Sequence, residues 1–478
     1  MSANDASKEE QPKADDEDDW TKYADANYAS EYDPWADMVE ADPVDDEEFD
    51  EDEFEEFDEG ESPTHDIPRA PAPNGIAHLV QIGICNHCLA RVSGMRQTEP
   101  SLGENGVVFR ANAETRDPDL TVDESVDCCP FCEDLFADVP IIADRICAAL
   151  ADVEFSLAQL GAHFAKDHVQ AEEEMRTRFA ATGSRPLKTS LVEQVQKAVV
   201  ERMPGVNWVK EKPEVMVLFD TLTLGVRVDI RSLFLYGRYR KLSREIPQTR
   251  WPCRSCRGRD GGCEACEGTG RQYQHTIQDL VGDLLTVEFQ PDDNSFHGMG
   301  REDIDVRCLG SGRPFVVELK SPRRRSTDLD ALVEKVNAAA DGMIEITGLR
   351  PSNKPEVARI KETRAEKSYT IYFRTDADCG EDEIRTRIES LSGKVLEQRT
   401  PQRVSHRRAD KVRKRKVISI GGIEIDGDEI RFSVRCESGT YVKELVHSDE
   451  GRTTPSVAGL LEAECEVIRL DVEDIHAD

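Results

Sequence analysis

Four pairs of cysteines, each with two residues between its members, constrain the fold of this chain more than any other feature. The pairs are Cys85 and Cys88, Cys129 and Cys132, Cys253 and Cys256, and Cys263 and Cys266. Each pair places two thiolates on one side of a tight turn, and two such pairs make a tetrahedral site for Zn²⁺. The spacing therefore predicts two structural zinc sites, because four cysteines leave no open position. The alternatives are unligated cysteines at the first site and a redox pair at the second.

The second cluster is the more compact of the two. Glycines alternate with its cysteines, and they let the backbone turn sharply so that its amides point at sulfur. The half CEACEGTG resembles the CxxCxGxG repeat of DnaJ-type zinc domains. We expect a small zinc-held finger that can lie against phosphates through its arginines, which are Arg250, Arg254, Arg257 and Arg259.

Charge is distributed unevenly along the chain. Residues 1–70 contain 28 acidic and 4 basic residues, whereas the remainder contains 68 acidic and 57 basic residues. So acidic a segment, poor in aliphatic residues, buries too little apolar surface to offset its ordering entropy. Residues 1–75 are therefore predicted to be a disordered acidic leader and linker. The many carboxylates, with 19 lysines beside 42 arginines, suggest a halophilic organism.

Hydropathy gives no sign of a membrane segment. No run of 18 apolar residues occurs, and the acidic N-terminus lacks the basic start and apolar core of a signal peptide. The sequence thus predicts a cytoplasmic protein with no membrane partner.

Periodicity predicts a mixture of helices and strands. A β-rich stretch is expected between Cys85 and Cys132, one long helical region over Pro140–Arg178, and a second helix over Ser190–Arg202. Apolar and β-branched runs predict strands at Val215–Phe219, Val226–Ile230 and Ser232–Tyr236. From Gln272 onward strands and helices alternate irregularly, so an α+β domain is expected there.

The segment FHGMGREDIDVRCLGSGRPF, residues 296–315, is a candidate for a catalytic loop. Glycines flank Arg301 and Asp303 at the entrance to an expected strand. A carboxylate at a loop–strand junction beside a guanidinium is suited to act as an ionised nucleophile or base. A surface Asp–Arg turn is the commoner meaning of a lone RxD.

These residues resemble a known family. RxD before a β-branched strand is similar to the catalytic motif of pseudouridine synthases, and GREDIDVRCLGSGRPF closely resembles the archaeal and eukaryotic family that makes pseudouridines 54 and 55 in tRNA. Four further segments resemble that family in order. They are YGRYRKLSREIPQTRWPC (236–253), KSY (367–369), TPQRVSHRR (400–408) and CESGTYVKEL (436–445).

The resemblance implies a multi-domain α+β enzyme. Residues 76–240 would form a zinc-bearing RNA-binding region, in which Leu187–Arg240 resembles a THUMP module. Residues 241–478 would form the mixed-sheet catalytic domain of a pseudouridine synthase, with a Cys-rich insertion at 253–266. The implied partner is tRNA, the expected state is a monomer, and no cofactor is required for the chemistry beyond structural Zn²⁺.

The resemblance also assigns roles residue by residue. Asp303 would be the nucleophile, Tyr369 would stack on the target uracil, and Tyr441 would lie in the active site and could transfer protons. Lys443 takes the place of the basic partner of the aspartate, where bacterial relatives carry arginine. Leu461 would help to floor the pocket, and Arg301 is expected to bind substrate.

Other basic and aromatic residues are candidates for contacts with RNA. They are Tyr236, Arg238, Tyr239, Arg240, Lys241, Arg244, Arg323–Arg325, and the basic residues from Arg403 through Lys416.

Two other functions compete with this one. Asp305 followed by Glu318 and Lys320 fits the D…ExK pattern of Mg²⁺-dependent nucleases. The second alternative is a non-catalytic zinc protein that binds tRNA. The intact RxD and GTYVKEL segments disfavour it, because a carboxylate in an RNA-binding cleft repels phosphate.

Overall fold

The computed structural model describes residues 73–94, 101–123, 126–179, 181, 184–259, 261–407 and 409–477. The predicted disordered leader therefore lies almost wholly outside the described residues. The chain divides into two compact units. The larger contains Ser62–Tyr372, Arg431–Ser438 and Ile468–Asp478, and the described part of the smaller contains Phe373–Ile430 and Gly439–Val467.

The segment between the first cysteine pairs is helical, so the prediction of a β-rich stretch is wrong. It contains α3 (Asn86–Val92) and α4 (Leu102–Arg116), and α2 (Pro73–Gln81) precedes it. Ser101 and Glu104 form a reciprocal capping box that starts α4. The β-branched Val107 and Val108 lie exposed on this helix. Local capping has outweighed their weak preference for strands.

The next part is a four-stranded sheet with helices, and the single helical region predicted over Pro140–Arg178 is wrong. The chain instead forms α5 (Val139–Leu150), β1 (Leu157–His163) and α6 (Lys166–Arg178). It continues through α7 (Leu187–Arg202), β2 (Asn207–Trp208), β3 (Val215–Asp220) and β4 (Val226–Ile230). The sheet order is β2-β1-β3-β4, with β1 parallel to β2 and β3. These non-local partners decide that β1 is a strand.

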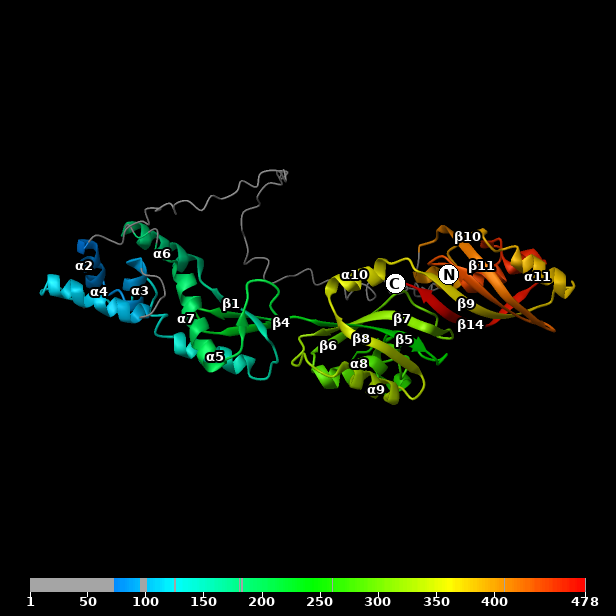
Figure 1. Ribbon diagram of the computed structural model, residues 1–478, viewed down its shortest axis with the longest axis horizontal. Helices are drawn as coiled ribbons and strands as arrows, with labels where there is room; N and C mark the ends of the chain where they lie inside the picture. The colour runs from blue at the N-terminus through cyan, green and yellow to red at the C-terminus, as the bar shows by residue number, and fades with distance from the viewer. Residues whose placement is uncertain are drawn as a thin grey trace, which may run out of the picture. The chain divides into compact units, whose positions relative to one another are not determined.

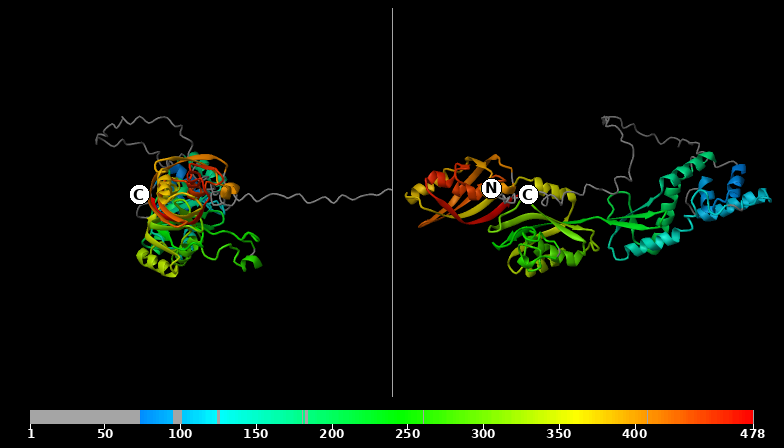
Figure 2. Two further views of the ribbon diagram at one scale, coloured as in Figure 1. Left: turned by 90° about the vertical axis from the view of Figure 1, so that its right-hand side faces the viewer. Right: turned by 180° about the vertical axis from the view of Figure 1, so that it is seen from behind.

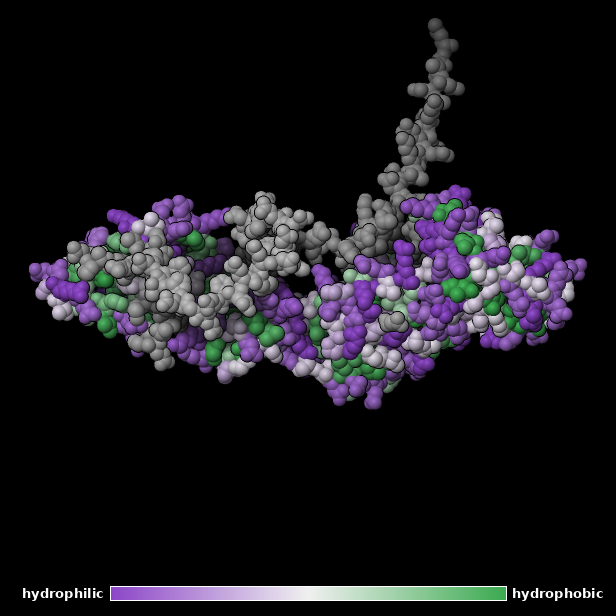
Figure 3. Space-filling model, turned by 45° about the horizontal axis from the view of Figure 1, so that its top comes forward, coloured by the Kyte–Doolittle hydropathy of each residue, from purple (hydrophilic) through white to green (hydrophobic). Residues whose placement is uncertain are grey.

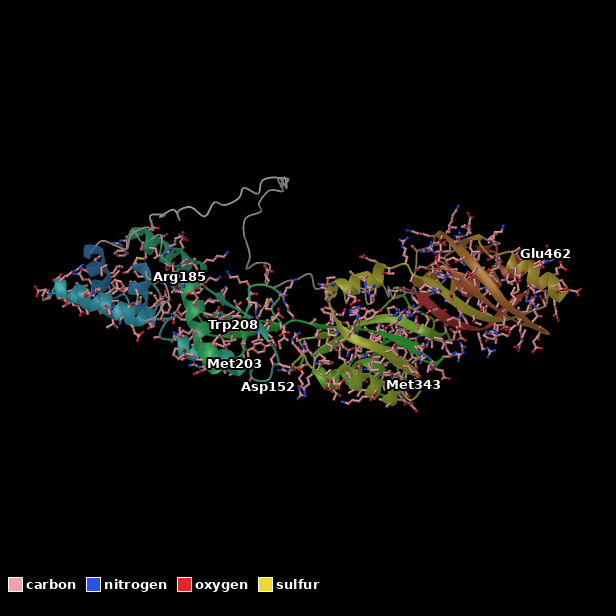
Figure 4. All side chains as sticks on the ribbon, viewed as in Figure 1. Asp152, Arg185, Met203, Trp208, Met343 and Glu462 are labelled. Atoms are coloured by element: carbon pink, nitrogen blue, oxygen red, sulfur yellow. The ribbon has the colours of Figure 1, made fainter. Side chains whose placement is uncertain are left out.

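One hydrophobic core joins the cysteine-bearing helices to this sheet. Figure 1 shows α5 and α7 beside the strands, and their buried residues include Ile142, Ile146, Leu191 and Val195. Met203 and Trp208, labelled in Figure 4, pack against the same core at the end of α7 and on β2. The N-terminal region is therefore one packed body.

The rest of the larger unit is built on an antiparallel sheet. Its elements are β5 (Leu233–Lys241), η2 (Glu264–Cys266), α8 (Ile277–Phe289), β6 (Asp293–Gly298), β7 (Arg307–Lys320), α9 (Leu329–Ala339), β8 (Ile344–Ser352) and α10 (Lys354–Glu362). Strand β5 lies between β7 and β8, and β6 pairs with β7. Helices α8 and α9 lie together on one side of these strands (Figures 1 and 2). Met343, labelled in Figure 4, packs against the core that they form with the sheet.

Three strands pass through both units along the chain: β9 (Glu366–Thr375), β12 (Glu429–Cys436) and β14 (Cys465–His476). Within the larger unit, β14 pairs in parallel with the start of β7. The smaller unit contains α11 (Glu381–Glu389), β10 (Val395–Arg399), η3 (Gln402–Arg407), β11 (Val412–Asp426), α12 (Val442–His447), β13 (Thr453–Thr454) and α13 (Val457–Leu461). There β10 pairs antiparallel with β11 and with β13.

On the face shown in Figure 3, hydrophilic residues predominate and hydrophobic ones are scattered among them. Among the described residues, no helix has the length and apolarity that crossing a bilayer requires.

Candidate active site

The RxD sequence lies in the loop that joins β6 to β7, and the backbone of this loop is fixed at both ends. The amide of Met299 donates to the carbonyl of Pro314 (2.9 Å), and Arg313 Nη1 donates to the carbonyl of Met299 (2.8 Å). The amide of Val306 donates to the carbonyl of Asp303 (3.1 Å), which closes a turn at the candidate nucleophile. The side chain of Asp303 is half-buried.

A buried network lies beneath this loop. Glu302 forms an ion pair with Arg313 (Oε2 to Nε, 2.8 Å), and both side chains are 1% exposed. The hydroxyl of Tyr239 donates to the same carboxylate (3.0 Å), and Gln248 Nε2 donates to that hydroxyl (2.8 Å) and to the carbonyl of Gly300 (3.0 Å). Glu302, the residue before Asp303, thus fixes the loop to the protein interior.

Lys241 supports the loop from β5. Its Nζ donates to the carbonyls of Asp303 (3.1 Å) and Ile304 (2.6 Å), and the residue is only 1% exposed. Burial lowers the pKa of this ammonium group to about 8, although the carboxylates of Glu302 and Asp305 oppose the shift. The buried amine of Lys241 therefore holds the backbone at the candidate nucleophile by hydrogen bonds.

Tyr369 and Lys367 on β9 lie near the same network. Burial raises the pKa of the Tyr369 hydroxyl, and the charge of Arg313 acts in the opposite direction. Burial and Arg313 lower the pKa of Lys367 to about 8. A Cβ at Gly300 would lie 3.3 Å from both Arg313 Nη1 and Lys367 Nζ. The structure thus brings Tyr369 and the RxD loop around one buried guanidinium, that of Arg313.

Arg301 projects from the loop as an exposed side chain. Its Cζ lies 4.9 Å from the centre of the Trp251 ring, at the base of the second cysteine cluster.

Tyr441, Lys443 and Leu461 belong to the smaller unit, where Tyr441 is fixed by its backbone. The amide side chain of the buried Gln398 accepts from the Tyr441 N–H (2.9 Å) and donates to the Tyr441 carbonyl (2.9 Å). Tyr441 occupies the N-cap position of α12, and its side chain makes no capping hydrogen bond there. Its hydroxyl is enclosed and meets no hydrogen-bonding partner in the described part of the chain.

Lys443 and Leu461 lie on the two short helices of this unit. Lys443, on α12, is half-buried, and its neighbour Glu444 is buried and forms an ion pair with Arg403 (2.6 Å). Leu461 is 4% exposed at the end of α13.

Several residues expected to contact RNA have partners within the protein. Tyr239 and Lys241 are buried in the network beneath the RxD loop. Arg240 pairs with Glu345, Arg244 pairs with the buried Asp471 (2.6 Å), and Arg403 pairs with Glu444. Burial makes the prediction of RNA contact wrong for Tyr239 and Lys241. Arg240, Arg244 and Arg403 keep partly exposed side chains beside their carboxylate partners, so RNA contact stays a prediction for them.

The first four cysteines gather at the junction of the N-terminal helices. Cys85 Sγ lies 3.6 Å from Cys132 Sγ, and the Cys85 amide points at Cys129 Sγ (3.3 Å). Arg91, fully buried, lies 3.6 Å from Cys88 Sγ and pairs with Glu172 (2.5 Å).

The second four cysteines form a similar cluster. Cys253 and Cys263 are 3.9 Å apart at sulfur, and Cys256 and Cys266 are 3.8 Å apart. Four thiolates bound at 2.3 Å to one tetrahedral ion lie about 3.8 Å apart, whereas a disulfide needs about 2.05 Å. Amides of Cys263 and Gly270 donate to Cys266 Sγ (3.1 Å each), and they lower the pKa of this thiol to about 6. Both clusters thus have the donor geometry of a metal site.

The residues of the nuclease pattern do not gather. Glu318 lies 3.5 Å from His297, and Lys320 pairs with Asp293 (3.1 Å), so both contact strand β6. Asp305 is exposed at the far end of β7. Within the described ranges, the groups of three or more possible metal ligands are the two cysteine clusters.

Sequence reasoning missed the residues that hold the site, above all Glu302, Arg313 and Gln398. The sequence signal for Glu302 is its position inside RxD, which does not indicate that the side chain is buried. Gln398 carried no signal, because its role depends on the arrival of Tyr441 from a distant segment.

Comparisons with known proteins agree with this geometry. The family model described as "Pus10, C-terminal" matches residues 234–476, and "Pus10 THUMP domain, archaeal" matches residues 142–220. The latter begins and ends earlier than the expected THUMP-like segment. A solved structure titled "Crystal Structure of a Cbf5-Nop10-Gar1 Complex" matches 50% of this chain and 48% of its own, with 18% identity and a TM-score of 0.27, too low to decide the fold.

Two curated relatives are each named "tRNA pseudouridine synthase Pus10". The protein of Methanothrix thermoacetophila is 42% identical over 70% of this chain and 73% of its own length. That of Halorubrum lacusprofundi is 36% identical over 83% of this chain and 94% of its own length.

An α+β chain with a THUMP module and a pseudouridine synthase-type catalytic domain is an RNA-modifying isomerase, so the expected fold class and enzyme class are confirmed. Within that class, the chain belongs to the Pus10 family.

Proposed function

We propose that the protein converts uridine to pseudouridine at position 54, position 55 or both in tRNA, in the cytoplasm, with Asp303 as the nucleophile. The observation that carries this proposal is the RxD loop, whose backbone is fixed by Lys241 and by the buried Glu302–Arg313 pair while Asp303 itself stays half-buried. A nucleophile held in this way loses little conformational freedom on reaction.

In the proposed reaction, the Asp303 carboxylate attacks the target nucleoside and the bond between N1 and the sugar breaks. The detached uracil rotates, and a bond from C5 to the sugar replaces the one from N1. The bond to Asp303 then breaks and releases the carboxylate. The proton lost from C5 passes to a base and N1 takes up a proton in its place, so the product is an isomer of the substrate.

The other site residues are proposed to bind the flipped nucleotide. Tyr369 stacks on the uracil and offsets part of the unstacking cost. Arg301 binds substrate beside the nucleophile. Tyr441, Lys443 and Leu461 are assigned from the GTYVKEL segment and the residues that follow it, and the enclosed hydroxyl of Tyr441 is suited to proton transfer because no described residue uses it.

Each cysteine cluster is proposed to hold one structural Zn²⁺. Cys85, Cys88, Cys129 and Cys132 would hold the first, and Cys253, Cys256, Cys263 and Cys266 the second. Metal at these sites supplies folding energy and leaves the isomerisation to the protein's own side chains.

The test is pseudouridine mapping of an unmodified tRNA transcript incubated at high KCl with the wild-type protein or with Asp303→Ala, each with and without EDTA. We expect pseudouridine at 54 or 55 with the wild type and none with the variant. Asp305→Ala is the matched control, because its carboxylate lies in the same segment and has no part in the proposed isomerisation. Unmodified tRNA that still binds the wild type would contradict the proposal, and so would cleavage that requires Mg²⁺.

A further inference from the structure

Trp251 lies at the base of the second cysteine cluster and is fixed there through its backbone. Its carbonyl accepts from the amide of Gln272 (3.0 Å), and the amide of the nearby Cys253 donates to the carbonyl of Gly270 (2.8 Å). Pro252 and Arg271 form a β-bridge between these two bonds. The two ends of the cysteine loop are thus joined at Trp251.

The same base is anchored to helix α8 by charge. Arg250 precedes Trp251, and Arg271 is part of the β-bridge. Both pair with Asp279 in the first turn of α8 (2.5 and 3.0 Å). Asp279 is buried and also accepts from the Thr276 hydroxyl (2.7 Å). Charges that are already paired and partly buried are poor ligands for phosphate, so Arg250 is a structural residue of this base.

The indole ring is held on its edge as well. Tyr273 meets it in an edge-to-face arrangement, with centroids 5.7 Å apart and an interplanar angle of 80°. Trp251 is half-buried, so part of the ring remains available for other contacts.

Arg301 lies against this ring, with Cζ 4.9 Å from its centre. Gln248 and Lys241 fix the loop backbone on either side of Arg301, at Gly300 and at Asp303. The arginine side chain, in contrast, is exposed and has many rotamers. A guanidinium within about 6 Å of an indole centroid is attracted by the ring quadrupole, most strongly for tryptophan.

We propose that Trp251 is a positioning residue for the reaction: its ring holds the guanidinium of Arg301 in place, two residues before the nucleophile. The cysteine finger then contributes to catalysis through its base, by supporting the RxD loop. This inference rests on the proposed function, because it takes Arg301 as a substrate-binding residue and Asp303 as the nucleophile.

The test is a double-mutant cycle with Trp251→Ala, Arg301→Ala and the double variant, measured as kcat and KM for pseudouridine formation in tRNA. We expect Trp251→Ala to lower kcat/KM about three- to tenfold, the size of a cation–π contact. We expect it to have no further effect in the Arg301→Ala background. Effects that multiply in the double variant would overturn the proposal, because Trp251 would then act independently, for example by stacking on an RNA base.

Two more variants distinguish an effect of the charge distribution of the Trp251 ring from an effect of its volume. Trp251→Phe keeps an aromatic face and is expected to retain at least half of wild-type kcat/KM, whereas Trp251→Leu keeps apolar volume without that face and should behave like Trp251→Ala. Equal activity of the Phe and Leu variants would overturn the proposal. Thermal unfolding of each variant shows whether the loss comes from folding, and Trp251→Phe provides the comparison if Trp251→Ala fails to fold.

The Asp303→Ala variant distinguishes a failure of the proposed function from a failure of the role proposed for Trp251. Pseudouridine formation that survives Asp303→Ala would refute the proposed nucleophile. Independent effects of Trp251 and Arg301, with Asp303→Ala inactive, would refute only the role of Trp251.

Discussion

At the scale of single residues, the site depends on buried polar groups that never reach the substrate. Lys241 and the Glu302–Arg313 pair are each about 1% exposed, and all contact or adjoin the RxD loop. Removing such groups from water is costly, so they persist only with complete partners. Two predictions follow from their burial.

The first prediction concerns pH. Burial lowers the pKa of Lys241 to about 8, while the unfolded chain keeps the usual value of 10.5. Between these values the unfolded state binds more protons than the folded state, so this lysine makes the free energy of unfolding rise with pH from 8 to 10.5. The rise is on the order of 3 kcal/mol. We expect this contribution to be absent in Lys241→Met, in which only the similar contribution of Lys367 remains.

Urea unfolding at pH 7, 8, 9 and 10 measures this difference between wild type and Lys241→Met. Lys394→Met, at an exposed lysine, is the control and should follow the wild type at every pH. Parallel curves for wild type and Lys241→Met would show that the buried amine is not desolvated as the structure indicates.

The second prediction concerns the buried ion pair. Glu302→Gln leaves the Arg313 guanidinium buried without a counter-charge, so we expect a loss of about 3 kcal/mol in the free energy of unfolding. Glu345→Gln breaks the half-exposed pair with Arg240 and should cost less than about 1 kcal/mol. Denaturant titration compares the two, and equal effects would contradict the structural role given to Glu302.

At the scale of secondary-structure elements, close packing decides which substitutions are tolerated. Helix α4 crosses the start of α3 at Gly106, where a Cβ would lie 1.9 Å from the carbonyl oxygen of Asn86. The helices approach so closely only because this position lacks a side chain. The contact forms one wall of the core that surrounds the first cysteine cluster.

We therefore expect Gly106→Ala to destabilise the protein by about 1–3 kcal/mol, because α3 and α4 must move apart. At an exposed helical position the same gain in helix propensity would be favourable, and Asn112→Ala on α4 should raise stability by about 0.5 kcal/mol. Thermal unfolding with metal content measured in parallel checks both variants. Stabilisation by Gly106→Ala would mean that the helices are farther apart than described.

At the scale of the whole molecule, the balance of charge governs how RNA is bound. The chain carries 96 acidic and 61 basic residues, and many arginines of the larger unit are paired internally, including Arg240, Arg244, Arg250 and Arg307. A cation already paired with a carboxylate contributes less to the release of counterions from phosphates, so we expect shape and stacking to supply more of the affinity.

The prediction is a shallow salt dependence of tRNA binding. A plot of log Kd against log KCl should have a slope below about 3, equivalent to roughly three neutralised phosphates. Filter binding of an unmodified transcript to Asp303→Ala across the molar range of KCl measures it without turnover. A slope of about 6 or more would contradict the prediction.

The sequence by itself determined the chemistry of this protein. The CxxC spacing predicted the two cysteine clusters, since two thiolates on one turn require only local geometry. The motifs around Asp303 and Tyr441 predicted the family, which the comparisons confirm. The strands Val215–Phe219 and Val226–Ile230 were also predicted correctly, because runs of apolar and β-branched residues are a local signal for strands.

Only the tertiary structure decided how that chemistry is held. Strand β1 depends on β2 and β3 as partners, so hydrophobic periodicity alone wrongly predicted a helix there. The sequence makes Lys241 a candidate phosphate ligand, but in the fold it is buried and donates to the carbonyl of Asp303, which comes from a distant segment. The sequence around a charged residue does not show whether its side chain faces solvent or a buried partner. Its role is therefore fixed by long-range contacts, which repay the cost of its burial.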